Sequence, residues 1–492
     1  MIFNSVTYLL FLLLVVLAYW ALPLRGRQWL IVASSLTFYG FWRPEFALVM
    51  LASASTDYFV ALRMTRSEDD RIRRRWLYLS FAVNLGFLFY FKYLYFVVGN
   101  GFALLRALGF DTSDPVLNIV LPLGISFYTF ETISYSVDVY RRTIRPERDF
   151  LVYACFITYF PKLVAGPILR AHQLIPQMKI MARASFDDVT EGVRRIIAGL
   201  FLKVALADNI APLVNDGFAQ STSTLSAPDV WTLAFLFGCQ IYFDFAAYSH
   251  IAIGTSRLMG IRLVENFNFP YTAVSPRDFW QRWHISLSGW IRDYLYLPLM
   301  GTRPALVQGS QALVAGDRVD TDGATPSRRR RTIALFTTWA IMGFWHGANW
   351  TFLVWGLLHA AYIFGYRVTE PLRERLSSGI RTAGGLAITL PLMMLAWIAF
   401  RAPGLETMFA LYAKIFQPTQ YLWLGMRENI YIVAALLLLL TLAARPLYER
   451  FVLPLERNPA FAFLGNATAF CALGVIVFTY LRPIAQFIYF AF

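Results

Sequence analysis

Long apolar runs recur along the whole chain and are separated by short, arginine-rich polar segments. Runs long enough to cross a hydrocarbon core of about 30 Å as helices are expected to span a membrane. They cover residues 2–22, 29–42, 44–62, 76–98, 116–140, 150–166, 230–248, 333–366, 385–400, 430–443 and 461–480. The pattern predicts an all-α polytopic membrane protein with roughly 11–13 transmembrane helices.

The composition agrees with this pattern, because 58% of the 492 residues are hydrophobic and 15% are charged. No segment between the runs has the length and mixed composition of a separate globular unit. We therefore expect one membrane-embedded domain over residues 1–492. Residues 301–331 are rich in Gly, Ser, Thr and Asp and end in four arginines, which is typical of a flexible cytoplasmic loop.

The net charge of +14 could suggest nucleic-acid binding, but the arginines lie in short loops beside the apolar runs. They cluster at residues 25–27, 63–75 and 141–148, after every second run. The positive-inside rule makes these loops cytoplasmic. The amino terminus is then expected outside, and the first run is interpreted as a retained helix.

One apolar run, residues 333–366, is much longer than the roughly 20 residues that one span needs, and arginines flank both of its ends. We predict that it enters the membrane and returns, with a break near Gly347 and Asn349. His346 would then lie about 22 Å into the membrane. Irregular backbone is tolerated there only if protein encloses it or it lines a wet cavity. The alternative is one long tilted helix that leaves one arginine cluster outside.

The segment "GFWHGANWTFLVWGLLHA" (343–360) places His346 among tryptophans and leucines. Ionisable groups also cluster in residues 242–271 and 277–299, and such groups in membrane segments indicate function or specific pairing. A metal site is disfavoured, since no histidine pair has helical i, i+4 spacing, no HExxH occurs, and the three cysteines read as small apolar residues.

Histidine suits general-base chemistry near neutral pH, so His346 could take a proton from a hydroxyl that attacks an activated acyl carbon. His284 and Asn349 are candidate second members of such a site. The competing interpretation is that His346 only caps a helix break. His359 reads as a structural, hydrogen-bonded histidine, because about 220° of rotation would separate it from His346 on one continuous helix.

Several segments resemble the membrane-bound O-acyltransferases. They are "RWHISLSGWIRDYLYLPL", "GFWHGANWTFLVWGLLHA", "YFDFAAYSHIAIG", "ENFNFPY", "SFYTFETISYSVDVYR", "YFPKLVAGPILR" and the ending "RPIAQFIYFAF". The resemblance covers nearly the whole chain and is closest to the bacterial branch that includes the membrane subunit of alginate O-acetylation. Related members serve peptidoglycan and cellulose acetylation and teichoic-acid D-alanylation.

The resemblance implies a ring of tilted helices around a central tunnel, with re-entrant segments. It makes His346 the principal catalytic histidine, His284 the second motif position, and Tyr489 a hydroxyl that could relay the acyl group. Substrate contacts are then expected from Asn349, Trp345, Trp283, Arg282 and Asp293.

The resemblance further implies acetyl-CoA or another acyl thioester as the cytoplasmic donor, with no permanently bound cofactor. The acceptor would be an extracytoplasmic polysaccharide, reached directly or through a periplasmic partner of the SGNH hydrolase type. The chain departs from the family pattern at His250, where an aspartate is expected, and in the length of residues 301–331.

Three alternatives stay open at this stage. Tyr489 could be an interfacial aromatic anchor. The acceptor could be a lipid, with the same histidine as base. A transporter or flippase would also bury charges, but it should show repeated halves, which the sequence lacks.

Overall fold

The computed structural model describes residues 1, 3–113, 117–304, 319–320 and 327–452, together with residues 454, 465, 468, 471–476 and 479. These residues are predominantly helical, and the two strands β1 (Arg303–Pro304) and β2 (Val319–Asp320) form one short antiparallel pair. The all-α polytopic prediction is confirmed. The chain divides into two compact units: unit 1 comprises residues 1–193, 252–264 and 303–320, and unit 2 comprises residues 194–251, 265–302 and 321–492.

Unit 1 is built from the amino-terminal helices. They are α1 (Val6–Ala21), α2 (Leu24–Gly40), α3 (Glu45–Met64), α4 (Asp70–Leu88), the π-helical η1 (Phe89–Tyr93), α5 (Leu94–Ala107), α6 (Ile125–Tyr140), α7 (Phe150–Thr158) and α8 (Ala171–Ile180). The unit boundaries at residues 193 and 251 fall within α9 (Phe186–Phe201) and α11 (Ala227–Leu258).

Unit 2 holds the later helices. They are η2 (Leu202–Ala207), α10 (Asp208–Ala219), η3 (Thr222–Thr224), η4 (Pro270–Thr272), α12 (Pro276–Arg282), α13 (Ile285–Ile291), η5 (Arg292–Tyr296), α14 (Leu297–Met300), α15 (Arg328–His346), α16 (Trp350–Val368), α17 (Glu370–Arg373), α18 (Ser378–Arg401), α19 (Leu405–Ile415), η7 (Pro418–Tyr421), α20 (Glu428–Leu447) and η8 (Tyr448–Val452).

Among the described residues, six helical segments are long and apolar enough to cross a membrane. They cover residues 45–64, 70–107, 186–219, 227–258, 378–401 and 428–452, and α1 is a shorter apolar helix. Five of the six match predicted runs. The segment 186–219 was missed, because the charged residues of α9 interrupt its apolar positions. The count of 11–13 spans and the ring around a tunnel stay predictions.

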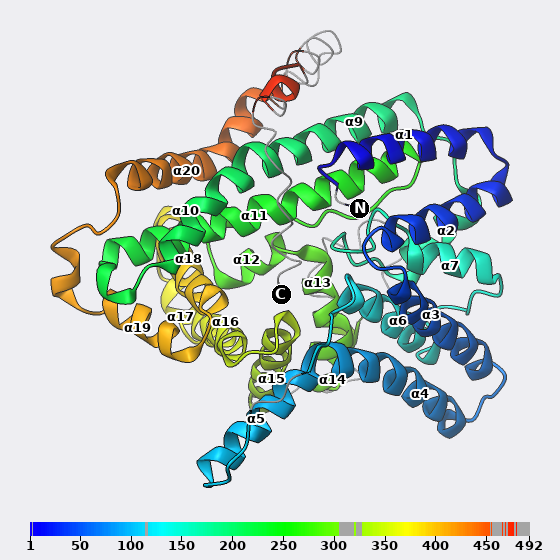
Figure 1. Ribbon diagram of the computed structural model, residues 1–492, viewed down its shortest axis with the longest axis horizontal. Coiled ribbons are helices and arrows are strands. Elements are labelled where there is room, and N and C mark those ends of the chain that lie inside the picture. The colour runs from blue at the N-terminus through cyan, green and yellow to red at the C-terminus, as the bar shows by residue number, and fades with distance from the viewer. Residues whose placement is uncertain are drawn as a thin grey trace. The chain divides into compact units, whose positions relative to one another are not determined.

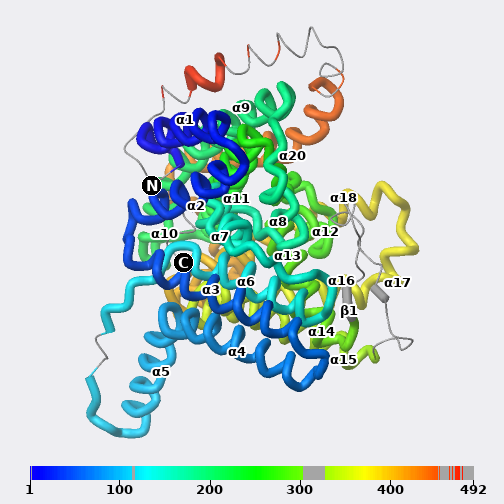
Figure 2. The backbone as a smooth tube through the Cα atoms, turned by 90° about the vertical axis from the view of Figure 1, so that its right-hand side faces the viewer, coloured from blue at the N-terminus to red at the C-terminus, as the bar shows by residue number. Residues whose placement is uncertain are grey.

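A buried carboxylate joins three helices of unit 1, α3, α4 and α6, which lie side by side (Figures 1 and 2). Asp57 on α3 accepts hydrogen bonds from the hydroxyls of Ser80 and Ser136 and from the Asn84 amide at 2.5 Å. Asn84 in turn accepts a hydrogen bond from Thr132 at 3.1 Å. A typical hydrogen bond within a protein contributes about 0.5–1.5 kcal/mol, so the several bonds of this network together hold the three helices in one register.

Helix α5 differs from these three helices because none of its residues is buried. It continues α4 through the π-helical η1 and projects away from α3, α4 and α6 in both views (Figures 1 and 2). Its exposed apolar side chains include Tyr95, Val97 and Leu104. In a chain of this composition such a surface suits contact with lipid.

Helices α15 and α16 form the helical hairpin that the sequence predicts. Helix α15 ends at His346, Gly347 is extended, and Asn349 caps α16 by accepting a hydrogen bond from the Thr351 amide at 3.1 Å. The two helices pack along each other where Gly343 faces Gly356, because a methyl group added at Gly356 would lie 3.2 Å from the Gly343 Cα. The prediction of a break and return is confirmed, and the single long helix is wrong.

We predict that Gly356→Ala destabilises the protein by about 1–3 kcal/mol, because the added methyl group would collide with the Trp339 carbonyl and push α15 from α16. Thermal melting in detergent measures the effect. The matched control is Gly365→Ala on the same helix, where an added Cβ meets nothing within 4 Å. Equal melting temperatures for the two variants would contradict the close glycine contact.

Candidate active site

His346 ends α15 in an aromatic enclosure within unit 2. Its side chain is buried, at 5% exposure. Its ring centroid lies 4.8 Å from Trp345, 4.7 Å from Trp355 and 5.2 Å from Phe400, and all three rings meet it edge to face. An imidazole held this way is shielded from bulk water and fixed in orientation, as a general base requires.

The break after His346 is held by Asn349, whose amide is used at both ends. Its oxygen accepts the Thr351 amide hydrogen, and its nitrogen donates to the Pro403 carbonyl at 2.9 Å. A methyl group at Gly347 would collide with the Phe352 ring. Asn349 and Gly347 therefore fix where α15 stops and how His346 is presented.

His284, the second predicted catalytic histidine, is fully buried and has a left-handed backbone with φ 42°. Such a conformation is strained for a residue with a Cβ, and it persists only where the surroundings impose it. The side-chain oxygen of Asn266 can only accept, so the His284 Nδ1 donates to it at 3.0 Å. Burial lowers the pKa of His284 to about 3, so the ring is neutral at physiological pH.

An unbroken series of aromatic contacts in unit 2 connects the two motif histidines. The ring centroid distances along it are 6.5 Å for His284–Phe267, 5.2 Å for Phe267–Trp283, 5.1 Å for Trp283–Trp397, 5.6 Å for Trp397–Phe400 and 5.2 Å for Phe400–His346. The structure thus brings Trp283, Trp345 and both histidines into one aromatic core. In the sequence, the tryptophan-rich segments around His284 and His346 indicate this aromatic core.

His359 lies in the same core, on α16. Its Nδ1 accepts a hydrogen bond from the Trp280 indole at 3.2 Å, and its ring stacks on Trp339 with 5.2 Å between centroids. The ring of Trp355 meets both histidines, at 4.7 Å from His359 and 4.7 Å from His346. The hydrogen bond expected for His359 is present. One continuous helix would put His346 and His359 on different faces, but the break after His346 allows both rings to contact Trp355.

The other charged candidates sit in local ion pairs. The Nε of Arg282 lies 2.7 Å from Asp278 on α12, and the buried Asp293 on η5 lies 2.7 Å from the Nε of Arg292. These pairings neutralise both predicted substrate contacts within their own helices. Substrate contact by Arg282 and Asp293 stays a prediction.

Two polar residues of α11 are also paired within unit 2. Lys203 of η2 lies 2.7 Å from Asp244 and 2.8 Å from Asp208. His250 receives a hydrogen bond from Arg195 at 3.2 Å, and the same guanidinium pairs with Glu265 at 2.7 Å. These pairs account for the charges in residues 242–271 that lie in this unit.

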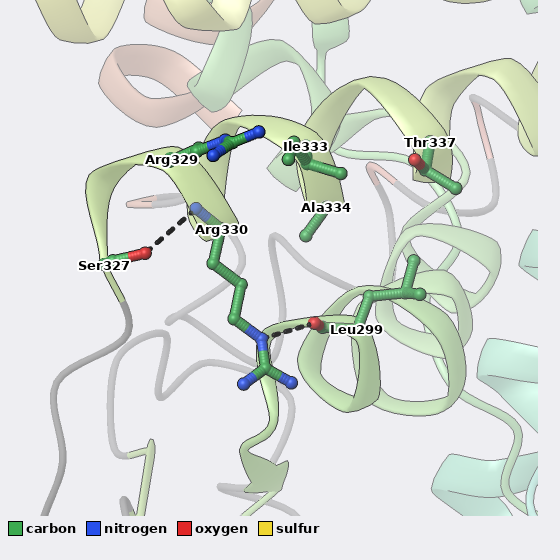
Figure 3. Close-up of a pocket in the computed structure, with 7 residues that line it drawn as sticks. All are labelled: Leu299, Ser327, Arg329, Arg330, Ile333, Ala334 and Thr337. Carbon is green, nitrogen blue, oxygen red and sulfur yellow. Dashed lines mark hydrogen bonds between the residues drawn. The ribbon is translucent and has the colours of Figure 1, made fainter.

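A cavity of about 210 Å³ opens at the start of α15 (Figure 3). The residues that line it are Leu299, Ser327, Arg329, Arg330, Ile333, Ala334 and Thr337. The Arg330 Nε donates to the Leu299 carbonyl at 3.0 Å, which fixes the guanidinium at the rim. Arg329 and Arg330 line the cavity together with apolar side chains. This combination suits a ligand with a phosphate group attached to an apolar or extended chain. The run of four arginines at residues 328–331 predicts the positive charge at this place, but the sequence does not predict the cavity.

Within the described part of the chain, no three His, Cys, Asp or Glu side chains converge where they could hold a metal ion. Tyr489, the predicted relay residue, lies outside the described residues.

Comparison with known proteins identifies the family of this chain. Residues 141–315 match the membrane-bound O-acyltransferase (MBOAT) family. The chain is 36% identical over 420 residues to a protein named "Probable alginate O-acetylase AlgI" from Azotobacter vinelandii, which covers 85% of this chain and 78% of the relative. It is 34% identical to a peptidoglycan O-acetyltransferase of Helicobacter pylori (79% and 73% covered) and 27% identical to a teichoic acid D-alanyltransferase of Bacillus subtilis (53% and 62% covered). The chain therefore belongs to the membrane-bound O-acyltransferase family.

Proposed function

We propose that this O-acyltransferase moves an acetyl group from a cytoplasmic thioester to a hydroxyl of an extracytoplasmic polysaccharide, with His346 as general base. The observation that carries the proposal is the burial of this one imidazole at a helix break, inside an aromatic enclosure. The relatives named for alginate and peptidoglycan O-acetylation support the acetyl group and the polysaccharide acceptor.

The proposed reaction needs a base, orientation and exclusion of water, because a thioester is already activated. The acceptor hydroxyl gives its proton to His346 while its oxygen bonds to the acyl carbon. The tetrahedral intermediate collapses, the carbon–sulfur bond breaks, and the imidazolium returns the proton to the departing thiolate. The products are an acetyl ester and a free thiol, and the histidine is regenerated.

The other candidate residues take supporting roles in this proposal. His284, fixed by its hydrogen bond to Asn266, is proposed as the second histidine of the site. Trp345 and Trp283 form aromatic walls, and Asn349 positions His346 through the cap of α16. Arg282 and Asp293 hold the wall of the site through their ion pairs.

The donor is proposed to be acetyl-CoA, approaching from the arginine-rich side of α15. The rim arginines of the cavity at residues 327–337 suit the phosphates of a nucleotide-containing donor. From this rim α15 leads to His346 over about 24 Å, at 1.5 Å per residue. That length matches an extended carrier arm whose thioester reaches the base while the phosphates stay at the surface.

The side of the membrane on which the acceptor lies is proposed from the predicted orientation of the helices in the membrane. With the arginine loops cytoplasmic, the amino terminus faces the periplasm of a bacterial inner membrane. The acyl group then leaves toward the periplasm, where a polysaccharide or an SGNH-type partner receives it. Tyr489 is proposed to carry the group on its hydroxyl on the way out.

We predict that His346→Ala abolishes acetyl transfer by purified protein supplied with labelled acetyl-CoA, while the melting temperature changes little. Loss of the base removes the proton acceptor, and general-base catalysis alone contributes about 100- to 10,000-fold. The control is His172→Ala, at an exposed position in unit 1. Full activity in the His346 variant would rule out the base role.

We predict that Tyr489→Phe lowers polysaccharide acetylation in cells at least tenfold, because the relay needs a hydroxyl that phenylalanine lacks. Mass spectrometry of surface glycans measures this, and Tyr480→Phe, in the last predicted apolar run, serves as the matched aromatic control. Unchanged acetylation in the Tyr489 variant would return this residue to the role of an interfacial anchor.

A further inference from the structure

Trp355 lies between the two histidines of the α15–α16 hairpin. Its side chain is 1% exposed, and its ring meets His346 at 79° and His359 at 70°, both with 4.7 Å between centroids. Its indole Nε1 is buried and finds no hydrogen-bond partner among the described residues. An indole N–H can only donate, so this group awaits an acceptor.

His359 presents a second donor of the same kind. Because its Nδ1 accepts the Trp280 indole hydrogen, the neutral ring carries its own hydrogen on Nε2. That Nε2 is also buried without a partner among the described residues. Trp280 thus fixes the tautomer that makes His359 a donor.

Buried polar groups in proteins are nearly always hydrogen-bonded, and leaving one unpaired is costly. Trp355 and His359 lie on the same helix with their rings in contact, and the donor nitrogen of each lacks an acceptor among the described residues. Three further hydroxyls of the hairpin are likewise buried without a partner there, namely those of Thr338, Thr351 and Tyr362. Because the Trp355 ring contacts His346, a substrate atom bound beside that histidine would be within reach as the acceptor for the two N–H hydrogens.

We propose that the Trp355 indole N–H, with the His359 Nε2–H beside it, donates to the thioester carbonyl oxygen and stabilises the negative charge that develops there. The proposal rests on the proposed acyl transfer. When the acceptor hydroxyl loses its proton to His346 and attacks the acyl carbon, the carbonyl π electrons move to the oxygen. Both N–H bonds stay intact, and the charge returns to the carbonyl when the thiolate leaves.

The chemistry of the enclosure supports two neutral donors in this role. The contacts around His346 are aromatic, so an oxyanion formed there receives little help from solvent. Donors fixed in advance by packing lose no energy to reorganisation as the charge forms. Trp355 and His359 both pack against Trp280, whose indole also donates to the His359 Nδ1, and this fixed contact meets the requirement.

The first test is Trp355→Phe, which keeps an aromatic ring and removes the N–H. With acetyl-CoA and a saturating acceptor we expect kcat to fall about 100-fold or more, as for loss of one oxyanion donor, while KM changes little. The matched control is Trp339→Phe, which alters a neighbouring indole of the same stack and should keep kcat within a few-fold of wild type. Equal rates in the two variants would overturn the proposal.

A second measurement separates the N–H from packing. Replacing the carbonyl oxygen of the donor by sulfur, as in dithioacetyl-CoA, weakens hydrogen bonding to that atom. Wild type should then prefer the oxygen donor, and Trp355→Phe should lose most of that preference. An unchanged oxygen-to-sulfur rate ratio in Trp355→Phe would overturn the proposal even if its kcat is low.

If Trp355→Phe does not fold, the pair His359→Gln and His359→Leu gives the answer. Glutamine keeps an N–H donor and should retain more activity than leucine by at least tenfold, whereas equal loss in both contradicts the role. An inactive wild type, with no transfer from acetyl-CoA, would instead sink the proposed acyl transfer itself. If the wild type is active and Trp355→Phe has the same kcat as the Trp339→Phe control, only the oxyanion role is contradicted.

Discussion

The constraint that organises this protein is that backbone polar groups cannot be left unpaired in hydrocarbon. A helix may break inside a membrane only where side chains and neighbouring backbone take up the freed groups. Residues 347–349 meet this condition, because Asn349 bonds to both Thr351 and Pro403 and the Phe352 ring closes over Gly347. The break brings His346 into contact with Trp355 of α16 and Phe400 of α18, so the surroundings of this histidine follow from how the break is satisfied.

The same constraint explains why so many polar side chains are buried yet paired. Asp57 is surrounded by hydroxyl and amide donors, and Lys203 lies between Asp244 and Asp208. Such pairs rarely add much net stability, since desolvation offsets their attraction. They do fix which helices meet and in what register. The Trp355 indole hydrogen and the His359 Nε2 hydrogen differ from these pairs, because neither finds an acceptor among the described residues.

Much of this could be read from the sequence, and the failures have physical causes. Apolar runs predicted the helices, and the glycine and asparagine after His346 predicted the break. Residues 186–219 were missed because the acidic and basic residues of α9 dilute its apolar face. The contact of Trp355 with both histidines depends on two helices folding back on each other, which spacing along one chain does not contain. Likewise, the local ion pair of Arg282 is a matter of side-chain geometry that composition does not specify.

The bond from Arg330 to the Leu299 carbonyl has a consequence for evolution and engineering. It fastens the first turn of α15 to the end of α14, with the guanidinium lying against Gly301. This hydrogen bond holds the end of α14 and the start of α15 together whatever the length of the segment that connects them. Because the entropy of closing a connection grows only with the logarithm of its length, insertions of new sequence between these helices should leave the hairpin undisturbed. Relatives could diverge freely at this point, and an affinity tag or reporter domain could be placed there.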